Sequence, residues 1–224
     1  MNAGRTSAAS KTGTYYLILE QSTVAKRSFR LKKIITISRE FGAGGGEIGK
    51  RIAETLGYHY ADKELIINAA RATNASPQTL INMDEKAPVI FGFTQSLFDL
   101  YNAPLEERFY ESQKKIIKQI AEAGNCVIVG RNANSILSEY DNTLHIFIHA
   151  ADYWRLQRLK AEKMPDESES KIAEHIKSVD KARRKYCSYF TNKDFGNADN
   201  YDLCLCSSKL GIDQCVKIIL DCCK

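Results

Sequence analysis

The chain has 224 residues, of which 44% are hydrophobic and 26% are charged, and its 32 basic and 27 acidic residues give a net charge of +5. This length supports one α/β domain with a sizeable core, and no stretch approaches the roughly 18 consecutive apolar residues of a membrane helix. A net charge of +5 does not by itself indicate a nucleic-acid-binding protein, so we expect neither a membrane nor a nucleic-acid partner.

Basic residues are concentrated in two segments. Residues 1–33 contain seven basic residues and one acidic residue, and residues 155–193 contain eleven basic and six acidic residues. The N-terminus has no apolar run joined to a cleavage site, and the seven cysteines form no CxxC pair. We therefore expect no signal peptide, no metal or disulfide framework, and a cytoplasmic protein.

The predicted elements begin after residues 1–32, which we interpret as a flexible extension of a domain at 33–224. The β-branched run KIITIS at 33–38 predicts a buried strand, and EIGKRIAETLG predicts the helix after it. A second helix is expected from Asp62. Residues 73–105 contain three of the four prolines and read as a helical insertion, followed by a helix at about 105–123.

The rest of the chain alternates strands with helices. Strands are expected at 125–130, 143–149 and 201–206, and helices at 133–139, across two charged stretches beginning at DYWRLQ and SESKIA, and at the C-terminus. This alternation predicts a mainly parallel sheet with helices on both faces. Ligands of such sheets bind at the carboxyl ends of the strands, where residues 38–47, 130–132 and 149–152 lie.

The glycine-rich segment SREFGAGGGEIGK is the main chemical signal. Glycines at 42, 44, 45 and 46 allow a tight turn whose amides point to one place, and the next helix adds its N-terminal partial charge. We expect a phosphate there. The alternative is a glycine-rich turn that binds nothing.

From residue 33 onward, the chain resembles the cytidylate kinase-like family. The resemblance rests on four stretches: ITISREFGAGGGEIGKRIAETLGYHYADKELI, CVIVGRNANSIL, LHIFIHAADYWRLQRL and KARRKYCSYFTNKDFGNADNYDLCLCSSKLGI. It implies a three-layer α/β fold of the P-loop NTPase class, with a monophosphate-binding insertion at 73–105 and a basic helical lid at 163–195. It also implies ATP and Mg²⁺ as cofactors and nucleotides as substrates.

The loop departs from the family pattern. Arg39 stands at the first loop glycine, Gly45 at the phosphate-binding lysine, and Gly46 at the magnesium-binding Ser or Thr. The loop lysine normally neutralises the transferring phosphate. We therefore predict that Arg39 takes part, together with Arg183 and Arg184 of the lid.

The same resemblance assigns an acceptor side. Gly130-Arg131-Asn132 is similar to a GRD motif whose arginine faces phosphate and whose aspartate helps to recognise the acceptor, and Asp62 matches the start of a helix beside the monophosphate. Asn132 keeps hydrogen-bonding capacity but loses the charge. A plain surface arginine and a plain helix cap remain the alternatives for Arg131 and Asp62.

Four arginines match the lid and its base: Arg155, Arg158, Arg183 and Arg184. A solvated basic helix end is the structural alternative, because cations complement the helix dipole there. Nucleic-acid binding is a second alternative use, because aromatic residues are interspersed with the basic residues of 181–190.

The sequence therefore predicts a nucleoside monophosphate kinase-like protein that transfers the γ-phosphoryl group of ATP to CMP or dCMP. A kinase of another small phosphate acceptor, or a nucleotide-binding module with weak catalysis, remains open. We expect Arg39, Arg131, Arg183 and Arg184 to be catalytic, and Asp62, Arg131 and Asn132 to bind the acceptor. The expected ATP-binding residues are Ser38, Gly42, Ala43, Gly44, Gly45, Gly46, Glu47, Arg155 and Arg158.

Overall fold

The computed structural model describes residues 34–62 and 95–224 of the chain. Five strands form one sheet in the order β2-β3-β1-β4-β5, and each neighbouring pair is parallel. The strands are β1 (Ile34–Arg39), β2 (His59–Ala61), β3 (Cys126–Val129), β4 (Thr143–His149) and β5 (Leu203–Cys206). The central strand β1 therefore has its carboxyl end between those of β3 and β4.

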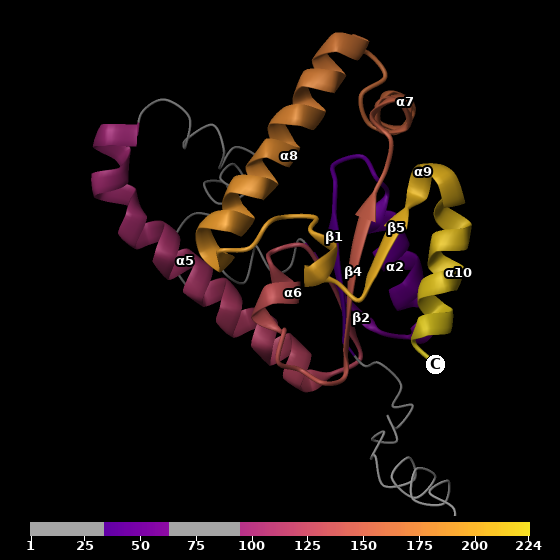
Figure 1. Cartoon of the computed structure of the whole chain (residues 1–224), viewed down its shortest axis with the longest axis horizontal. Helices are drawn as coiled ribbons and strands as arrows, with labels where there is room; N and C mark the ends of the chain where they lie inside the picture. Colours follow the sequence, from indigo (N-terminus) through magenta and orange to yellow (C-terminus); the bar gives the residue numbers. More distant parts are fainter. Residues whose placement is uncertain (1–33, 63–94) are drawn as a thin grey trace, which may run out of the picture. The chain divides into compact units, whose positions relative to one another are not determined.

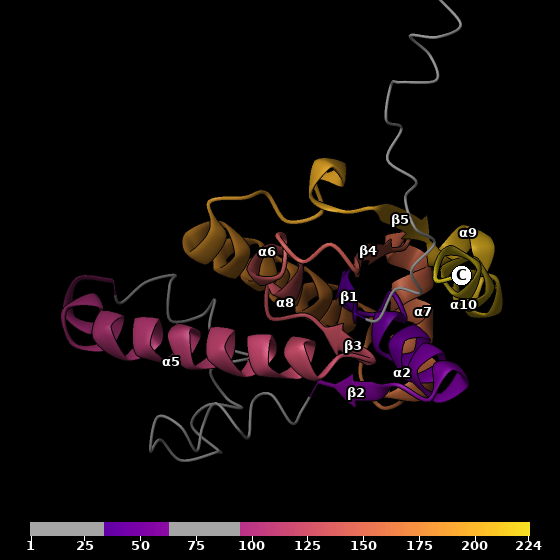
Figure 2. The same ribbon diagram turned by 90° about the horizontal axis from the view of Figure 1, so that it is seen from below.

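Helices cover both faces of this sheet (Figures 1 and 2). On one face lie α2 (Gly45–Leu56) and α10 (Ile212–Cys222), and on the other lie α5 (Gln95–Ala123) and α6 (Ala133–Ile136). The remaining helices are α7 (Asp152–Glu162), α8 (Glu169–Thr191), α9 (Ser207–Leu210) and the short 3₁₀ helix η1 (Ala198–Asn200).

Strand periodicity explains the two cores. Successive side chains of a strand point to opposite faces, so Ile35 and Ile37 of β1 pack with α2 and α10, whereas Ile34 packs with α5 and α6. All three side chains are essentially inaccessible to solvent. A strand that is buried on both faces reads as a continuous apolar run, which is the pattern that predicted β1.

The structure confirms the predicted fold class: a parallel sheet between two helical layers. Several details differ from the sequence prediction. Strand β2, the 3₁₀ helix η1 and the short helix α9 were not predicted, and α5 begins at Gln95 rather than near residue 105. The helix expected from Asp62 and the part of the insertion at 73–94 lie outside the described residues.

Candidate functional site

The glycine loop joins the end of β1 to the start of α2. Gly42 and Gly44 have φ angles of 79° and 82°, in the left-handed region that favours glycine. The first helical hydrogen bond runs from the Ile48 amide to the Gly44 carbonyl, at 3.0 Å. The amides at positions 45–47 precede that bond, so the helix provides no acceptor for them. The loop can therefore offer several N–H groups to one anion.

Arg39 fills the space that a side chain at position 45 would need. A Cβ atom on Gly45 would lie 2.6 Å from Arg39 Cβ, and one on Gly130 would lie 2.0 Å from Arg39 Nη1. The guanidinium Nη2 lies 3.9 Å from Asp62 Oδ1. The Arg39 side chain thus packs over two glycines, and its guanidinium lies between the glycine loop and Asp62.

Tyr60 connects Asp62 to the first turn of α2. Its hydroxyl lies 3.3 Å from the Gly46 carbonyl and 3.3 Å from Asp62 Oδ2. Burial, reinforced by the Asp62 charge and opposed by Arg39, raises the pKa of Tyr60 to about 12. The phenol therefore stays protonated at neutral pH and can donate to either oxygen.

The segment after β3 adopts a strained conformation beside Arg39. Gly130, Arg131 and Asn132 have φ angles of 85°, 59° and 54°. Non-glycine residues in this region are uncommon and often mark functional sites. The Gly130 amide donates to the Ile37 carbonyl at 2.9 Å, which fixes the segment against β1. Asn132 then caps α6 and is 8% exposed.

Asn132 belongs to a buried polar cluster that the sequence analysis did not identify. Gln113 Nε2 donates to the Tyr186 hydroxyl at 2.9 Å. Burial and neighbouring Tyr186 raise the pKa of Tyr110 to about 12. Among the described residues, Gln113 Oε1 and Asn132 Nδ2 find no hydrogen-bond partner. The spacing of Tyr110 and Gln113, one helical turn apart, was the available signal.

Arg155 and Arg158 are engaged by carboxylates. Arg155 is 5% exposed and contacts Asp152 and Asp180, the latter at 2.5 Å. Arg158 Nη2 donates to Glu47 at 2.5 Å and to Glu162 at 3.0 Å.

Arg158 also lies against the loop, because a Cβ on Gly44 would be 2.7 Å from its Nη1. Its guanidinium carbon lies 5.6 Å from the centre of the Trp154 ring. Both arginines predicted for ATP thus border the loop.

Helix α8 spans most of the predicted lid and contacts the loop directly. Arg183 Nη1 donates to the Arg39 carbonyl at 2.8 Å, and its guanidinium lies 5.7 Å from the centre of the Phe41 ring. Arg184 is exposed. The structure therefore brings Arg183 to the loop and leaves Arg184 on the solvent side of α8.

The remaining loop residues hold the loop on the sheet. Ser38 is buried, and its hydroxyl donates to Asn134 Oδ1 at 3.3 Å. Ala43 is buried, and its carbonyl accepts a 2.8 Å hydrogen bond from the Ser207 hydroxyl of α9. Glu47 is exposed on the first turn of α2.

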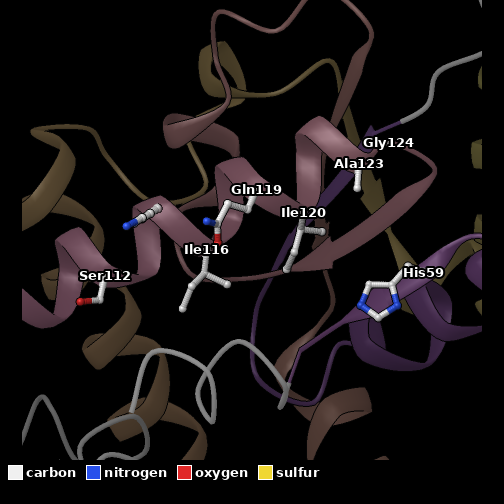
Figure 3. Close-up of a pocket in the computed structure, with 8 residues that line it drawn as sticks. His59, Ser112, Ile116, Gln119, Ile120, Ala123 and Gly124 are labelled. Carbon is white, nitrogen blue, oxygen red and sulfur yellow. The ribbon is translucent and has the colours of Figure 1, made fainter. Parts of the chain in front are cut away.

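A groove of about 670 Å³ lies elsewhere, between β2 and α5. Figure 3 shows His59 at one end and Ile116 and Ile120 along α5. None of the glycine-loop residues 38–47 lines this groove. Within residues 34–62 and 95–224, no group of three or more His, Cys, Asp or Glu side chains is placed to hold a metal ion, and no helix is long and apolar enough to cross a membrane.

Known proteins match this chain in sequence and in fold. A family model described as the cytidylate kinase-like family matches residues 34–209. No curated protein matches the sequence.

Among solved structures, an uncharacterized protein from Eubacterium ventriosum is 25% identical with a TM-score of 0.63, and covers 84% of this chain and 96% of its own. Shikimate kinase from Bacteroides thetaiotaomicron is 14% identical with a TM-score of 0.50 and the same two coverages, a likeness of fold alone. With 176 of its residues (34–209) matched by the family model, the chain belongs to the cytidylate kinase-like family.

Proposed function

We propose that this protein transfers the terminal phosphoryl group of MgATP to a nucleoside monophosphate, with CMP or dCMP as the acceptor. The family supports a kinase-like phosphotransferase. The observation that carries the proposal is the position of Arg39, whose side chain lies over Gly45 and Gly130 and whose guanidinium approaches Asp62.

Arg39 performs the task of the missing lysine in this proposal. An acceptor phosphate oxygen attacks the γ-phosphorus, and the bond from that phosphorus to the bridging oxygen of ADP breaks. Catalysis of this step depends on holding the groups in line and neutralising their charge. Loop amides hold the donor phosphates, and Arg39, Arg131 and Arg183 supply positive charge. Arg184 would have to turn inward to join them.

The acceptor side is proposed to consist of Asp62, Arg131 and Asn132. The planar guanidinium of Arg131 suits a phosphate. Asn132 Nδ2 and Gln113 Oε1 provide one donor and one acceptor whose protein partners are missing among the described residues. The N3 and N4 edge of cytosine offers the complementary acceptor and donor, which supports a cytidine nucleotide as acceptor.

Assays of Arg39 variants test the donor side. Removing one hydrogen-bond donor that stabilises transition-state charge costs about 10²- to 10³-fold in kcat, and by analogy we expect that loss for Arg39→Ala, with partial activity in Arg39→Lys. Lys50→Ala is the matched control, because Lys50 is exposed on α2 and pairs with Glu54 at 3.9 Å. Equal kcat values for Arg39→Ala and Lys50→Ala would contradict the assignment. Calorimetry that finds no ATP affinity, with or without Mg²⁺, would refute the whole proposal.

The acceptor needs a separate assay. Wild-type protein is incubated with MgATP and each common nucleoside monophosphate, and phosphoryl transfer is measured by product formation. We expect CMP and dCMP to be the best substrates. The Asn132→Asp variant should change the ranking of the bases as acceptors more than it changes the dependence of the rate on ATP. Transfer only to a metabolite outside this panel would instead favour a kinase of another small phosphate acceptor.

A nucleotide-binding module without transfer is the second candidate. It is favoured by Gly45 and Gly46, which provide neither the lysine nor the hydroxyl of an ordinary phosphate loop. Its signature would be tight ATP binding without product from any acceptor over long incubation.

A further inference from the structure

The peptide groups on both sides of Phe41 are held by partners that are distant in sequence. The Phe41 amide donates to Asp180 Oδ1 at 2.7 Å, and the Phe41 carbonyl accepts from Arg155 Nη1 at 3.1 Å. Phe41 immediately precedes Gly42, the first loop residue with a positive φ. The two contacts therefore determine the direction in which the chain enters the glycine loop.

Asp180 and Arg155 form a buried ion pair. Arg155 Nη1 donates to Asp180 Oδ2 at 2.5 Å, and the two residues are 5% and 2% exposed respectively. Burying two charges is unfavourable unless their geometry and further hydrogen bonds compensate. Asp180 meets that condition because its second oxygen accepts the Phe41 amide. One carboxylate thus binds both the arginine and the loop.

Helix α8 is fixed to the loop around this carboxylate. One turn after Asp180, Arg183 donates to the Arg39 carbonyl at 2.8 Å. On the N-terminal side of Asp180 in α8, His175 packs edge-to-face on the Phe41 ring, with 5.0 Å between ring centres. Figure 1 shows α8 passing beside the turn that follows β1. The contacts therefore hold residues 39–41 to about two turns of α8.

We propose that Asp180 is a positioning residue for the phosphate loop. By binding the Phe41 amide and orienting Arg155 on the Phe41 carbonyl, it holds the loop in the shape that directs the amides of residues 42–47 to one anion. The proposal rests on the proposed function for the nature of that anion. Asp180 itself does not touch the nucleotide, and Arg155 acts through the loop.

The experiment compares Asp180→Ala, Asp180→Asn and Ile117→Ala in the full-length protein. Asp180→Ala removes the acceptor of the Phe41 amide, whereas Asp180→Asn retains one oxygen for it and loses the charge. Ile117→Ala is the control, because Ile117 is fully buried on α5 and belongs to a cluster with Ala121 and Leu137 that contains no residue of 39–46. Hydrogen exchange of residues 39–46, melting temperature and the Kd for ATP are measured for each protein.

We expect amide exchange at 39–46 to rise at least tenfold in Asp180→Ala, and the Kd for ATP to rise at least tenfold. Asp180→Asn should change both by less than Asp180→Ala. Ile117→Ala should lower the melting temperature while leaving amide exchange at 39–46 and the Kd for ATP within threefold of wild type.

Unchanged exchange at 39–46 in folded Asp180→Ala would overturn the proposal. So would faster exchange with an unchanged Kd for ATP. If wild type binds no ATP, the proposed function fails on its own, and the exchange of residues 39–46 still decides whether Asp180 holds the loop.

Discussion

Gly45 and Gly46 are adjacent glycines for which the structure predicts opposite responses to the same methyl group. A Cβ on Gly45 would lie 2.6 Å and 2.9 Å from Cβ and Cγ of Arg39, atoms close to the backbone that cannot move aside independently. A Cβ on Gly46 would find Tyr60 Oη as its nearest neighbour, at 3.8 Å. Optimal carbon contacts are at about 3.5–4.0 Å, so only the first substitution is overpacked.

The comparison isolates the steric effect. Both residues lie in the first turn of α2 with ordinary helical backbone, so the gain in helix propensity from glycine to alanine largely cancels. Overpacking costs about 1–3 kcal/mol, so Gly45→Ala should be less stable than Gly46→Ala by that amount. At about 2–4 °C per kcal/mol for a chain of this size, the melting temperatures should differ by several degrees.

Urea or thermal unfolding without nucleotide measures this difference. Stabilities of Gly45→Ala and Gly46→Ala that agree within about 0.5 kcal/mol would refute the packing of Arg39 on Gly45. A phosphoryl-transfer assay provides a second test of this packing. Gly45→Lys alone should lower the rate of phosphoryl transfer because it displaces Arg39. The double variant, Gly45→Lys with Arg39→Gly, should transfer the phosphoryl group faster than the single variant Arg39→Gly. A gain in transfer from Gly45→Lys alone would contradict the same reasoning.

Three further predictions concern titration, a buried hydroxyl and a thiol. Burial raises the pKa of Tyr60 and of Tyr110 to about 12, so their contribution to stability is complete below pH 10 and is lost as pH rises towards 12. Urea unfolding should show this fall, and each Tyr→Phe variant should flatten it. Ser207→Ala removes the hydroxyl that donates to the Ala43 carbonyl at 2.8 Å, which should cost about 1–3 kcal/mol in the same assay. Cys126 is fully buried, and burial raises its thiol pKa to about 11, so thiol reagents should modify it only on unfolding; rapid modification of the native protein would contradict its placement.

Some elements could not be predicted because they are defined by their neighbours. Strand β2 has three residues, too few for a periodic pattern, and exists as a strand because His59–Ala61 pair with β3. Helix α5 continues through Pro104, although proline in a helix interior removes a hydrogen bond and crowds the preceding turn. The sequence prediction placed the start of this helix near residue 105, just after that proline.

The candidate site likewise combines a feature that could be predicted from the sequence with one that could not. Glycine spacing after a buried strand was sufficient to predict the loop, because the positive φ angles of Gly42 and Gly44 are a local backbone preference of glycine. The buried role of Asp180 was not predicted, since it depends on a contact with Phe41, 139 positions away in the chain. Asp180 was not singled out in the sequence, where it is one of six acidic residues within the basic segment 155–193.

What the sequence by itself determined is the α/β class, three of the five strands nearly to the residue, and a turn suited to phosphate. These features depend on hydrophobic periodicity and on backbone freedom, both of which are properties of a few consecutive residues. Only the tertiary structure decided which arginines reach the loop. Arg39 and Arg183 contact it, whereas Arg184 faces solvent. A long charged side chain takes its partner from whatever the fold brings within a few ångströms, and no local pattern specifies that choice.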